Sequence, residues 1–242
     1  MLGQQAYERL HITSSAALEV NLRRQLELLN DVVFSDDEWK WFFAKKIASK
    51  NEGIVEKTAR IQEDWIQVLA RDDGTSKNIR LIDKSNIHAN RLQVINQYEA
   101  VVEGAGGSRK HRYDVTILVN GLPLVHIELK RRGVPLKESF NQINRYQRES
   151  FWADAGLFEY IQIFVISNGT HTKYYANTTR ARKVAESEGG KRRRKQTSNS
   201  FEFTSWWTDA EKNRRIGDLA AFTRTFFLQA HAAERVDEIL CL

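Results

Sequence analysis

The chain has a single cysteine, Cys241, among its 242 residues, so no intrachain disulfide can form. A protein without disulfides is typical of a reducing compartment, and we expect this one to be cytoplasmic. No apolar run approaches the roughly 18 residues that a membrane-spanning helix needs, which predicts neither a signal peptide nor a membrane partner. The six histidines show no H-x-x-x-H or cysteine–histidine spacing, which argues against a zinc site.

The sequence also lacks the motifs of common nucleotide-binding and hydrolase sites. There is no G-x-x-x-x-G-K-[ST] segment, and the glycine-rich stretch 104–110 lacks that spacing and is not expected to follow a strand. Neither a nucleophile elbow nor a dinucleotide-binding fingerprint is present. We therefore assign no ATP binding to these residues.

The composition is that of a globular protein with a basic excess. A hydrophobic content of 41% and a charged content of 28% are ordinary values, and the length suffices for one α/β domain with a real core. The formal net charge of +6 favours polyanionic partners, although so modest an excess is weak support alone.

The most informative segment, residues 112–130, predicts a β-hairpin. Two apolar runs flank Asn120-Gly121, and both residues of that pair tolerate the positive φ of a tight hairpin turn. The alternating apolar residues are Val115, Ile117 and Val119 on the first strand and Val125, Ile127 and Leu129 on the second. The hairpin also carries Asp114, Glu128 and Lys130, charged side chains that are costly there unless they bind something.

The turn decides whether these charged side chains meet. A plain two-residue loop at Asn120-Gly121 sets Asp114 opposite Ile127, off the face of Glu128. A three-residue loop over 120–122, or one β-bulge, sets Asp114 directly opposite Glu128. We therefore predict that the hairpin is not closed by a plain two-residue turn.

Two carboxylates and a lysine in one place fit a divalent metal beside a phosphate. Mg²⁺ prefers carboxylate oxygens, usually one or two, with water and phosphate in the rest of its shell. A bound metal would polarise the scissile phosphate, while Lys130 would stabilise developing charge or position the attacking water. The alternative is a solvated strand face with a Glu128–Lys130 pair. His126 shares this face, as a support for the site or as a hydrogen-bonded structural histidine.

A helix is predicted over 136–150. Gln142 and Tyr146 lie at i and i+4 and so share one of its faces, with Arg145 and Arg148 nearby. A basic helix beside a hairpin with paired carboxylates suits a phosphate backbone that passes a metal. The alternative is an ordinary helix face with a tyrosine packed inward.

The other segments have plainer patterns. Helices are expected over 14–30, with the apolar stripe Leu18, Leu22, Leu26 and Leu29, and from the start signal at 35–38. Strands are expected over 60–70, 78–83, 92–97, 160–166 and 171–176, with a turn at 72–74 and a loop at 104–110. The aromatic residues expected to pack in the core rather than stack on DNA are Trp39, Trp41, Phe42 and Phe43.

Residues 180–200 form the one low-complexity region and contain five consecutive basic residues, 191–195. Such a block indicates a solvated, disordered loop, and it is equally compatible with a non-specific DNA-binding arm. From Thr208 onward the chain is expected to be mainly helical. Its apolar stripe consists of Leu219, Phe222, Phe226 and Phe227.

The chain resembles the amino-terminal nuclease domain of the restriction (R) subunit of type I restriction–modification enzymes, a PD-(D/E)XK nuclease with a Q-x-x-x-Y motif. The resemblance extends over roughly residues 15–180 and is carried by the segments 90–98, 112–125, 127–133, 140–146 and 157–169. It implies an α/β fold of the restriction-endonuclease type, with a mixed central β-sheet flanked by helices. The implied divisions are a nuclease domain over 1–179 (core about 55–179), a basic loop over 180–200 and a helical extension over 201–242.

The resemblance also implies roles for the site residues. The catalytic residues carried over are Asp114, Glu128, Lys130, Gln142 and Tyr146. Asp114 and Glu128 would hold Mg²⁺ together with the Leu129 carbonyl, for cleavage of double-stranded DNA. The residues expected to bind DNA are Arg112, Arg131, Arg132, Arg145 and Arg148.

The partners implied are double-stranded DNA, the modification and specificity subunits, and an ATP-driven motor that alone would bind ATP. Two departures from the family are expected: no motor precedes Leu242, and the acidic first helix is truncated or missing. Glu8 and Glu19 are weak candidates to replace the glutamate of that helix.

These departures leave an alternative function, a DNA-binding and scaffold module that is inactive without the first helix and the motor. In such a chain the apolar stripe after Leu219 would be an orphaned interdomain surface. A Holliday-junction or repair nuclease shares the metal triad, but the length of the resemblance to the R subunit argues against it.

Overall fold

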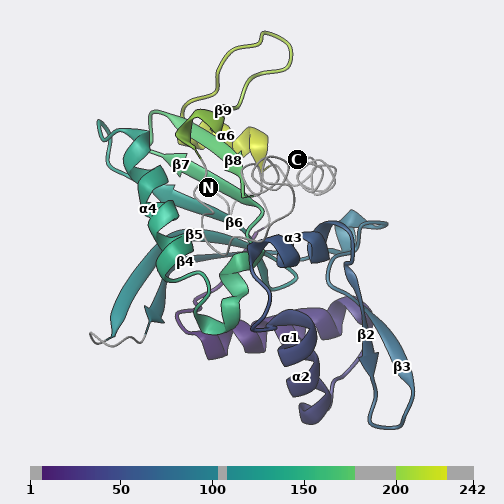
Figure 1. The fold of residues 1–242 in the computed structure, drawn as a ribbon. Coiled ribbons are helices and arrows are strands. Elements are labelled where there is room, and N and C mark those ends of the chain that lie inside the picture. Colours follow the sequence, from purple (N-terminus) through teal and green to yellow (C-terminus); the bar gives the residue numbers. More distant parts are fainter. Residues whose placement is uncertain (1–6, 103–107, 178–199, 228–242) are drawn as a thin grey trace, which may run out of the picture.

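The computed structural model describes residues 7–102, 108–177 and 200–227, and a seven-stranded mixed sheet lies at its centre (Figure 1). The strands, in their order across the sheet, are β1 (Glu8–Arg9), β4 (Leu92–Val102), β5 (Arg109–Val119), β6 (Leu122–Leu129), β7 (Ile163–Ser167), β8 (Thr172–Ala176) and β9 (Ser205–Trp206). β1 is parallel to β4 and β6 is parallel to β7, whereas the other neighbours are antiparallel. A separate hairpin is formed by β2 (Ile66–Ala70) and β3 (Ser76–Arg80).

Helices cover both faces of this sheet, which confirms the predicted fold class. The helices are α1 (Ser15–Asn30), α2 (Asp36–Phe42), α3 (Ile54–Gln62), α4 (Leu136–Glu149) and α6 (Leu219–Phe226), with short helical turns at Phe43–Ile47, Ile87–Ala89, Asp154–Tyr160 and Phe201–Phe203. On one face, apolar side chains of α1, α3 and α4 share a buried cluster with the sheet. On the other face, α6 forms a second cluster with the alternate strand residues.

The two expected N-terminal helices are confirmed. Ser14 caps α1, and Ser35 caps α2 in a reciprocal capping box with Glu38. In the stripe of α1, Leu18, Leu22 and Leu26 are fully buried and Leu29 is half-buried. Of the aromatic group, Trp39 and Phe42 are buried as expected, Phe43 packs against the core, and Trp41 is exposed instead.

The β5–β6 hairpin combines a two-residue loop with one β-bulge. Asn120 and Gly121, both with positive φ, form the loop. The paired positions are Val119 with Leu122, Leu118 with Pro123, Ile117 with Val125, Thr116 with His126 and Val115 with Ile127. Leu124 is therefore the extra residue, and the next step of the register sets Asp114 opposite Glu128. The predicted bulge is confirmed, and the alternative three-residue loop is not formed.

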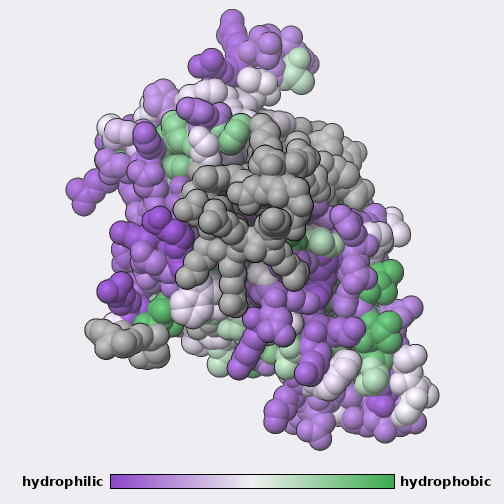
Figure 2. Space-filling view, viewed as in Figure 1, coloured by the Kyte–Doolittle hydropathy of each residue, from purple (hydrophilic) through white to green (hydrophobic). Residues whose placement is uncertain are grey.

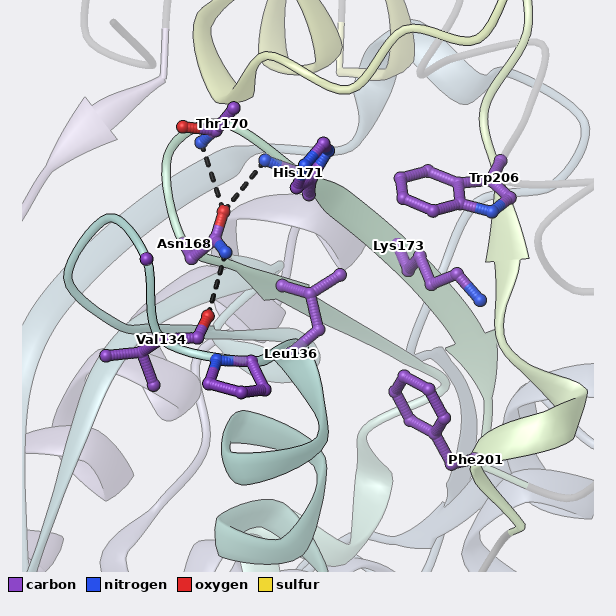
Figure 3. Close-up of a pocket in the computed structure, with 10 residues that line it drawn as sticks. Val134, Leu136, Asn168, Thr170, His171, Lys173, Phe201 and Trp206 are labelled. Atoms are coloured by element: carbon purple, nitrogen blue, oxygen red, sulfur yellow. Dashed lines mark hydrogen bonds between the residues drawn. The ribbon is translucent and has the colours of Figure 1, made fainter.

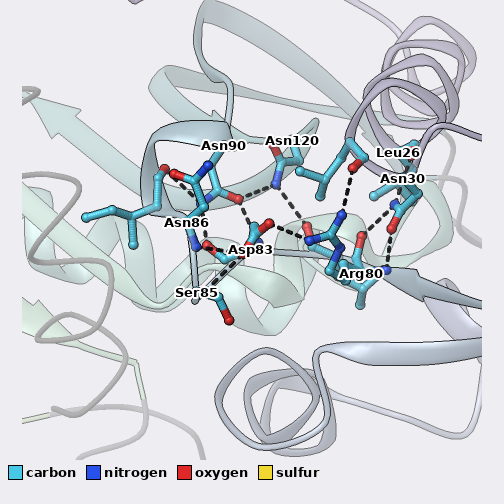
Figure 4. Close-up of polar contacts among 11 residues, drawn as sticks. Leu26, Asn30, Arg80, Asp83, Ser85, Asn86, Asn90 and Asn120 are labelled. Carbon is cyan, nitrogen blue, oxygen red and sulfur yellow. Dashed lines mark hydrogen bonds and ion pairs between the residues drawn. The ribbon is translucent and has the colours of Figure 1, made fainter.

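Buried polar contacts hold the loop of this hairpin in place (Figure 4). The Asn120 side chain accepts a hydrogen bond from the Arg91 backbone N at 2.9 Å and donates to the Leu81 carbonyl at 3.1 Å and to Asn90 Oδ1 at 2.7 Å. A Cβ on Gly121 would lie 2.7 Å from a backbone atom of α1, so only glycine fits there. The hairpin is thus anchored at its closed end, which fixes the register at its open end.

Three strand predictions need correction at their ends. Residues 60–62 belong to α3, so the strand expected over 60–70 starts only at Ile66. The strand expected over 78–83 ends at Arg80, because Asp83 turns the chain by accepting hydrogen bonds from the backbone N of Ser85 and Asn86. β4 continues past the expected end at residue 97 to Val102, so the glycine-rich stretch does follow a strand, although its spacing still excludes a phosphate-binding loop.

The C-terminal third also differs from expectation. The strand expected over 160–166 starts at Ile163, because the segment before it forms a 3₁₀ turn, and β8 confirms its paired neighbour. Residues 208–218 are not helical; Thr208 bridges to Arg215, and α6 starts only after the Asp218 cap.

The apolar stripe of the tail is not an orphaned surface. Its members Phe222, Phe226 and Phe227 are buried against the sheet, which overturns that expectation. The basic segment before Ser200 and the tail after residue 227 lie outside the described residues. Within the described ranges, no helix has the length and hydrophobicity needed to cross a membrane.

Candidate active site

Asp114 lies on β5, one residue beyond the last aligned pair of the hairpin. Its Oδ2 accepts a hydrogen bond from the backbone N of Leu129 at 2.8 Å, which fixes the carboxylate beside the end of β6. Burial, and then the charge of Glu128, raises the pKa of Asp114 above its usual range. Two carboxylates held in this way concentrate negative charge, and a bound cation would relieve it.

Glu128 is fully buried and has a partner at each carboxylate oxygen. Its Oε1 accepts a hydrogen bond from Lys130 Nζ at 2.9 Å, and its Oε2 lies 3.3 Å from His126 Nε2. His126 is itself fully buried, and its ring packs against those of Tyr113 and Tyr146. Because both oxygens are held, the carboxylate has a defined orientation. His126 is buried and its Nε2 contacts a site carboxylate, which agrees with both roles considered for it, a support for the site and a hydrogen-bonded structural histidine.

A chain of hydrogen bonds runs from Lys130 through α4 to β5. Lys130 Nζ donates to Gln142 Oε1 at 2.5 Å, and the Gln142 amide donates to the Tyr146 hydroxyl. That hydroxyl donates to the Arg112 carbonyl at 2.9 Å. Burial raises the pKa of Tyr146 to about 12, so its hydroxyl keeps its proton and remains a donor at neutral pH. Gln142 and Tyr146 do share one helix face, and the tyrosine is packed inward as well.

Side chains that the sequence did not single out support this arrangement. The Tyr113 hydroxyl donates to Ser150 Oγ at 2.7 Å, which ties β5 to the end of α4. The Tyr113 ring also packs against Phe151 and Phe158. These contacts join residues far apart in the chain, and no local pattern of spacing indicates them.

The donor set fits a hard divalent cation. Two carboxylates are the number that Mg²⁺ commonly takes from a protein, with water and phosphate supplying the remainder. The described ranges contain no group of three or more His, Cys, Asp or Glu side chains placed to hold a metal, so the site is not a closed protein cage. The two weak candidates for a further carboxylate have other partners: Glu8 accepts from Gln93 and Glu19 from Trp39.

The five arginines predicted to bind DNA are all exposed. Arg112 lies on β5 two residues before Asp114, and Arg131 directly follows Lys130. The Arg145 guanidinium lies 6.0 Å from the ring centroid of Tyr146, so it is held at the site's own helix. These exposed side chains can therefore contact a polyanion without any rearrangement of the protein core.

Comparison with known proteins gives the same family along most of the chain. Residues 2–183 match the family model described as type I restriction enzyme R protein N terminus. The chain is 45% identical over 227 residues to the type I restriction enzyme EcoprrI endonuclease subunit of Escherichia coli. This match covers 93% of this chain and 66% of that protein.

Two further relatives are more distant. The type I restriction enzyme SsaAORF53P endonuclease subunit of Staphylococcus saprophyticus is 35% identical over all of this chain, and the match covers 23% of that protein. A putative type I restriction enzyme MjaIXP endonuclease subunit of Methanocaldococcus jannaschii is 31% identical over 113 residues, which is 45% of this chain and 10% of that protein. The chain thus spans just under two thirds of the E. coli relative and less than a quarter of the staphylococcal one.

Proposed function

Because this chain belongs to the family of type I restriction enzyme R protein N termini, we propose that it is a Mg²⁺-dependent nuclease domain that hydrolyses phosphodiester bonds of double-stranded DNA. The observation that carries the proposal is the array of buried Glu128 with half-buried Asp114 and Lys130 at the open end of one hairpin. Charges of both signs that are withdrawn from water and held by hydrogen bonds are costly to maintain and typical of a reaction site.

Each residue of the array has a role that follows from its contacts. Asp114 and Glu128 would hold the metal, with the Leu129 carbonyl completing the protein's share. When bound, Mg²⁺ would polarise the scissile phosphate and acidify a water molecule. Lys130 directs its ammonium group to the same place, where it can stabilise developing negative charge or orient the attacking water. Gln142 holds Lys130 by accepting a hydrogen bond from its ammonium group, and Tyr146 holds Gln142 by accepting one from its amide.

Double-stranded DNA is the proposed substrate because exposed basic side chains lie on the elements that carry the array, namely β5, the loop after β6 and α4. These are the five arginines Arg112, Arg131, Arg132, Arg145 and Arg148. Outside the grey atoms, the face of the molecule drawn in Figure 2 is mostly hydrophilic, with hydrophobic residues in smaller patches. These arginines would position the phosphate backbone without reading its sequence.

Removal of the metal tests the proposal. In a plasmid-nicking assay with Mg²⁺, we expect the protein to convert supercoiled DNA to the nicked form, EDTA to reduce nicking to background, and excess Mg²⁺ to restore it. A Lys130→Met protein purified in the same way reports any contaminating nuclease. Nicking that survives EDTA, or that the variant retains in full, would contradict the proposal.

A second candidate function is DNA binding and scaffolding without turnover. The match covers 23% of the staphylococcal subunit, and this function assigns to that part of such an enzyme the holding of DNA and metal, with turnover dependent on the rest of the enzyme. In a complete enzyme, the proposed partners are modification and specificity subunits and an ATP-driven motor. The proposed location is the cytoplasm, a reducing compartment in which proteins rarely form disulfides. DNA binding and Mg²⁺ binding without nicking is the result that this second function predicts.

A further inference from the structure

A pocket of about 580 Å³ lies between the start of α4 and the turn that joins β7 to β8 (Figure 3). One wall is the loop 133–136, which follows β6 and leads into α4. The turn 168–171 between β7 and β8, together with Lys173 on β8, forms the floor, and Phe201 and Trp206 close the far side. None of these lining residues has a role in the proposed hydrolysis, so the pocket needs its own explanation.

The pocket and the catalytic array lie on the same face of the sheet. The aligned residues across four neighbouring strands are Glu128, Ile166, Lys173 and Trp206. In-register residues point to the same face, and strands are about 4.8 Å apart, so the backbone of Lys173 is roughly 10 Å from that of Glu128. A molecule bound at the active site could therefore extend into the pocket.

The position is also one where sheets of this kind bind ligands. β6 and β7 are a parallel pair, and both the array and the pocket lie at their carboxyl ends. Ligands of open α/β sheets bind in the crevice outside those ends. The loop that follows Lys130 runs directly into the pocket wall, and the Lys130 backbone N donates to the Ser167 carbonyl at 2.8 Å, which joins the two sites.

The lining combines aromatic rings with positive charge. Phe201 and Trp206 are half-buried, so part of each ring remains open to a ligand. Lys173 Nζ lies 5.1 Å from the ring centroid of Phe201 and 5.0 Å from that of Trp206, and the guanidinium of Arg215 lies 5.4 Å from the Trp206 ring. Two cations therefore flank one aromatic wall.

The polar atoms of the turn are already used to shape it. The Asn168 side chain donates to the Val134 carbonyl at 2.8 Å and accepts from the backbone N of Thr170 and His171. These contacts lock the turn against the loop, so the pocket is a preformed feature of the fold. Its ligand would therefore meet apolar surface, aromatic rings and cations rather than a set of free hydrogen-bonding groups.

We propose that this pocket binds one unpaired nucleotide, with its base against Phe201 and Trp206 and its phosphate beside Lys173 and Arg215. The proposal rests on the proposed nuclease function, which supplies the DNA strand about 10 Å away. Lys173 Nζ donates to Thr204 Oγ1 at 2.9 Å and to the Thr204 carbonyl at 3.3 Å, but within the described ranges neither Lys173 nor Arg215 has a carboxylate partner. A purely apolar ligand would leave both cations without an anion, and a bare phosphate would leave the aromatic wall unused. A nucleotide uses both, because bases stack on aromatic rings and phosphates pair with cations.

The test measures binding to the full chain in EDTA, so that cleavage cannot interfere. The probes are dAMP, a short single strand of deoxyadenosines and a blunt duplex of equal length. We expect Trp206→Ala to weaken binding of the single strand by about tenfold, the usual size of one lost stacking contact. Lys173→Met should also weaken it and reduce the dependence of log affinity on log salt by about 0.7. Trp152→Ala is the matched control, because Trp152 is exposed outside the pocket.

Each outcome bears on the proposal. If dAMP binds and both variants weaken its binding, the ligand is a free nucleotide. If only the single strand binds and both variants weaken that binding, the ligand is a nucleotide of DNA. Wild-type affinity of Trp206→Ala and Lys173→Met for dAMP and the single strand would overturn the proposal, as would binding of neither of these two probes, or of the duplex alone, by the wild-type protein. Should Trp206→Ala fail to fold, Lys173→Met carries the test. Mg²⁺-dependent nicking is scored separately, so the pocket and the nuclease can fail independently.

Discussion

Glu128→Gln is expected to lower Mg²⁺-dependent nicking by at least about 100-fold. The substitution keeps the size of the side chain but removes the charge that would hold the metal and that now binds Lys130 Nζ at 2.9 Å. Mutation of a residue that only hydrogen-bonds to a metal ligand typically lowers metal affinity or activity by about 10–100-fold, so loss of a direct ligand should lower activity at least as much. Initial rates of plasmid nicking measure the effect.

The matched control is Glu138→Gln, which removes an exposed carboxylate from the first turn of α4. It should nick at the wild-type rate. Thermal unfolding followed by circular dichroism must show Glu128→Gln folded, so that lost activity is not lost structure. A folded Glu128→Gln protein with wild-type nicking would remove Glu128 from the reaction.

Lys57→Met is expected to destabilise the protein by about 3–5 kcal/mol, the usual cost of removing one partner from a buried ion pair. Only 1% of the Lys57 side chain is exposed, and its Nζ lies 2.8 Å from both Glu159 Oε2 and the Gly156 carbonyl. Methionine fills the space but leaves the half-buried carboxylate of Glu159, 18% of whose side chain is exposed, without its cation. For a domain of this size, each kcal/mol lowers Tm by about 2–4 °C, so calorimetric unfolding would detect the change readily.

The pH dependence of this loss has a definite sign. Burial already raises the pKa of Glu159, and Lys57 opposes that rise. In Lys57→Met the folded-state pKa rises further, so protonated Glu159 favours folding at low pH and this contribution is lost as pH rises through the folded pKa. The variant should therefore lie closer to wild type in acid than at neutral pH. The double variant Lys57→Met/Glu159→Gln should recover part of the loss, and an equal loss at all pH values would contradict this account.

The hairpin and α4 could be predicted from sequence because their signals are local. Asn120-Gly121 marks the turn, period-two alternation marks the strands, and the demand that Asp114 face Glu128 requires the bulge that is found. Helix spacing alone sets Gln142 and Tyr146 on one face. For these elements, pattern and tertiary structure agree, which is typical of segments that fold consistently at every level.

Tertiary contacts decide the features that the sequence did not reveal. Lys57 reads as a surface residue of α3, and only its approach to residues about 100 positions away buries it. Residues 208–218 resemble a helix in composition, yet they follow the edge strand β9, and Thr208 bridges to Arg215. The pocket residues Lys173 and Trp206 meet only through strand pairing. Such long-range contacts leave no periodic trace in one sequence.

Calorimetric titration of Mg²⁺ into the wild-type protein and Asp114→Ala tests the central claim most directly, because it needs neither DNA nor turnover. The account predicts that the wild-type protein and the exposed-carboxylate control Asp37→Ala bind Mg²⁺ at one site, and that Asp114→Ala, shown to be folded by its thermal unfolding, does not. Equal binding by wild-type and Asp114→Ala protein, or no binding by the wild type, would contradict a metal site at the open end of this hairpin.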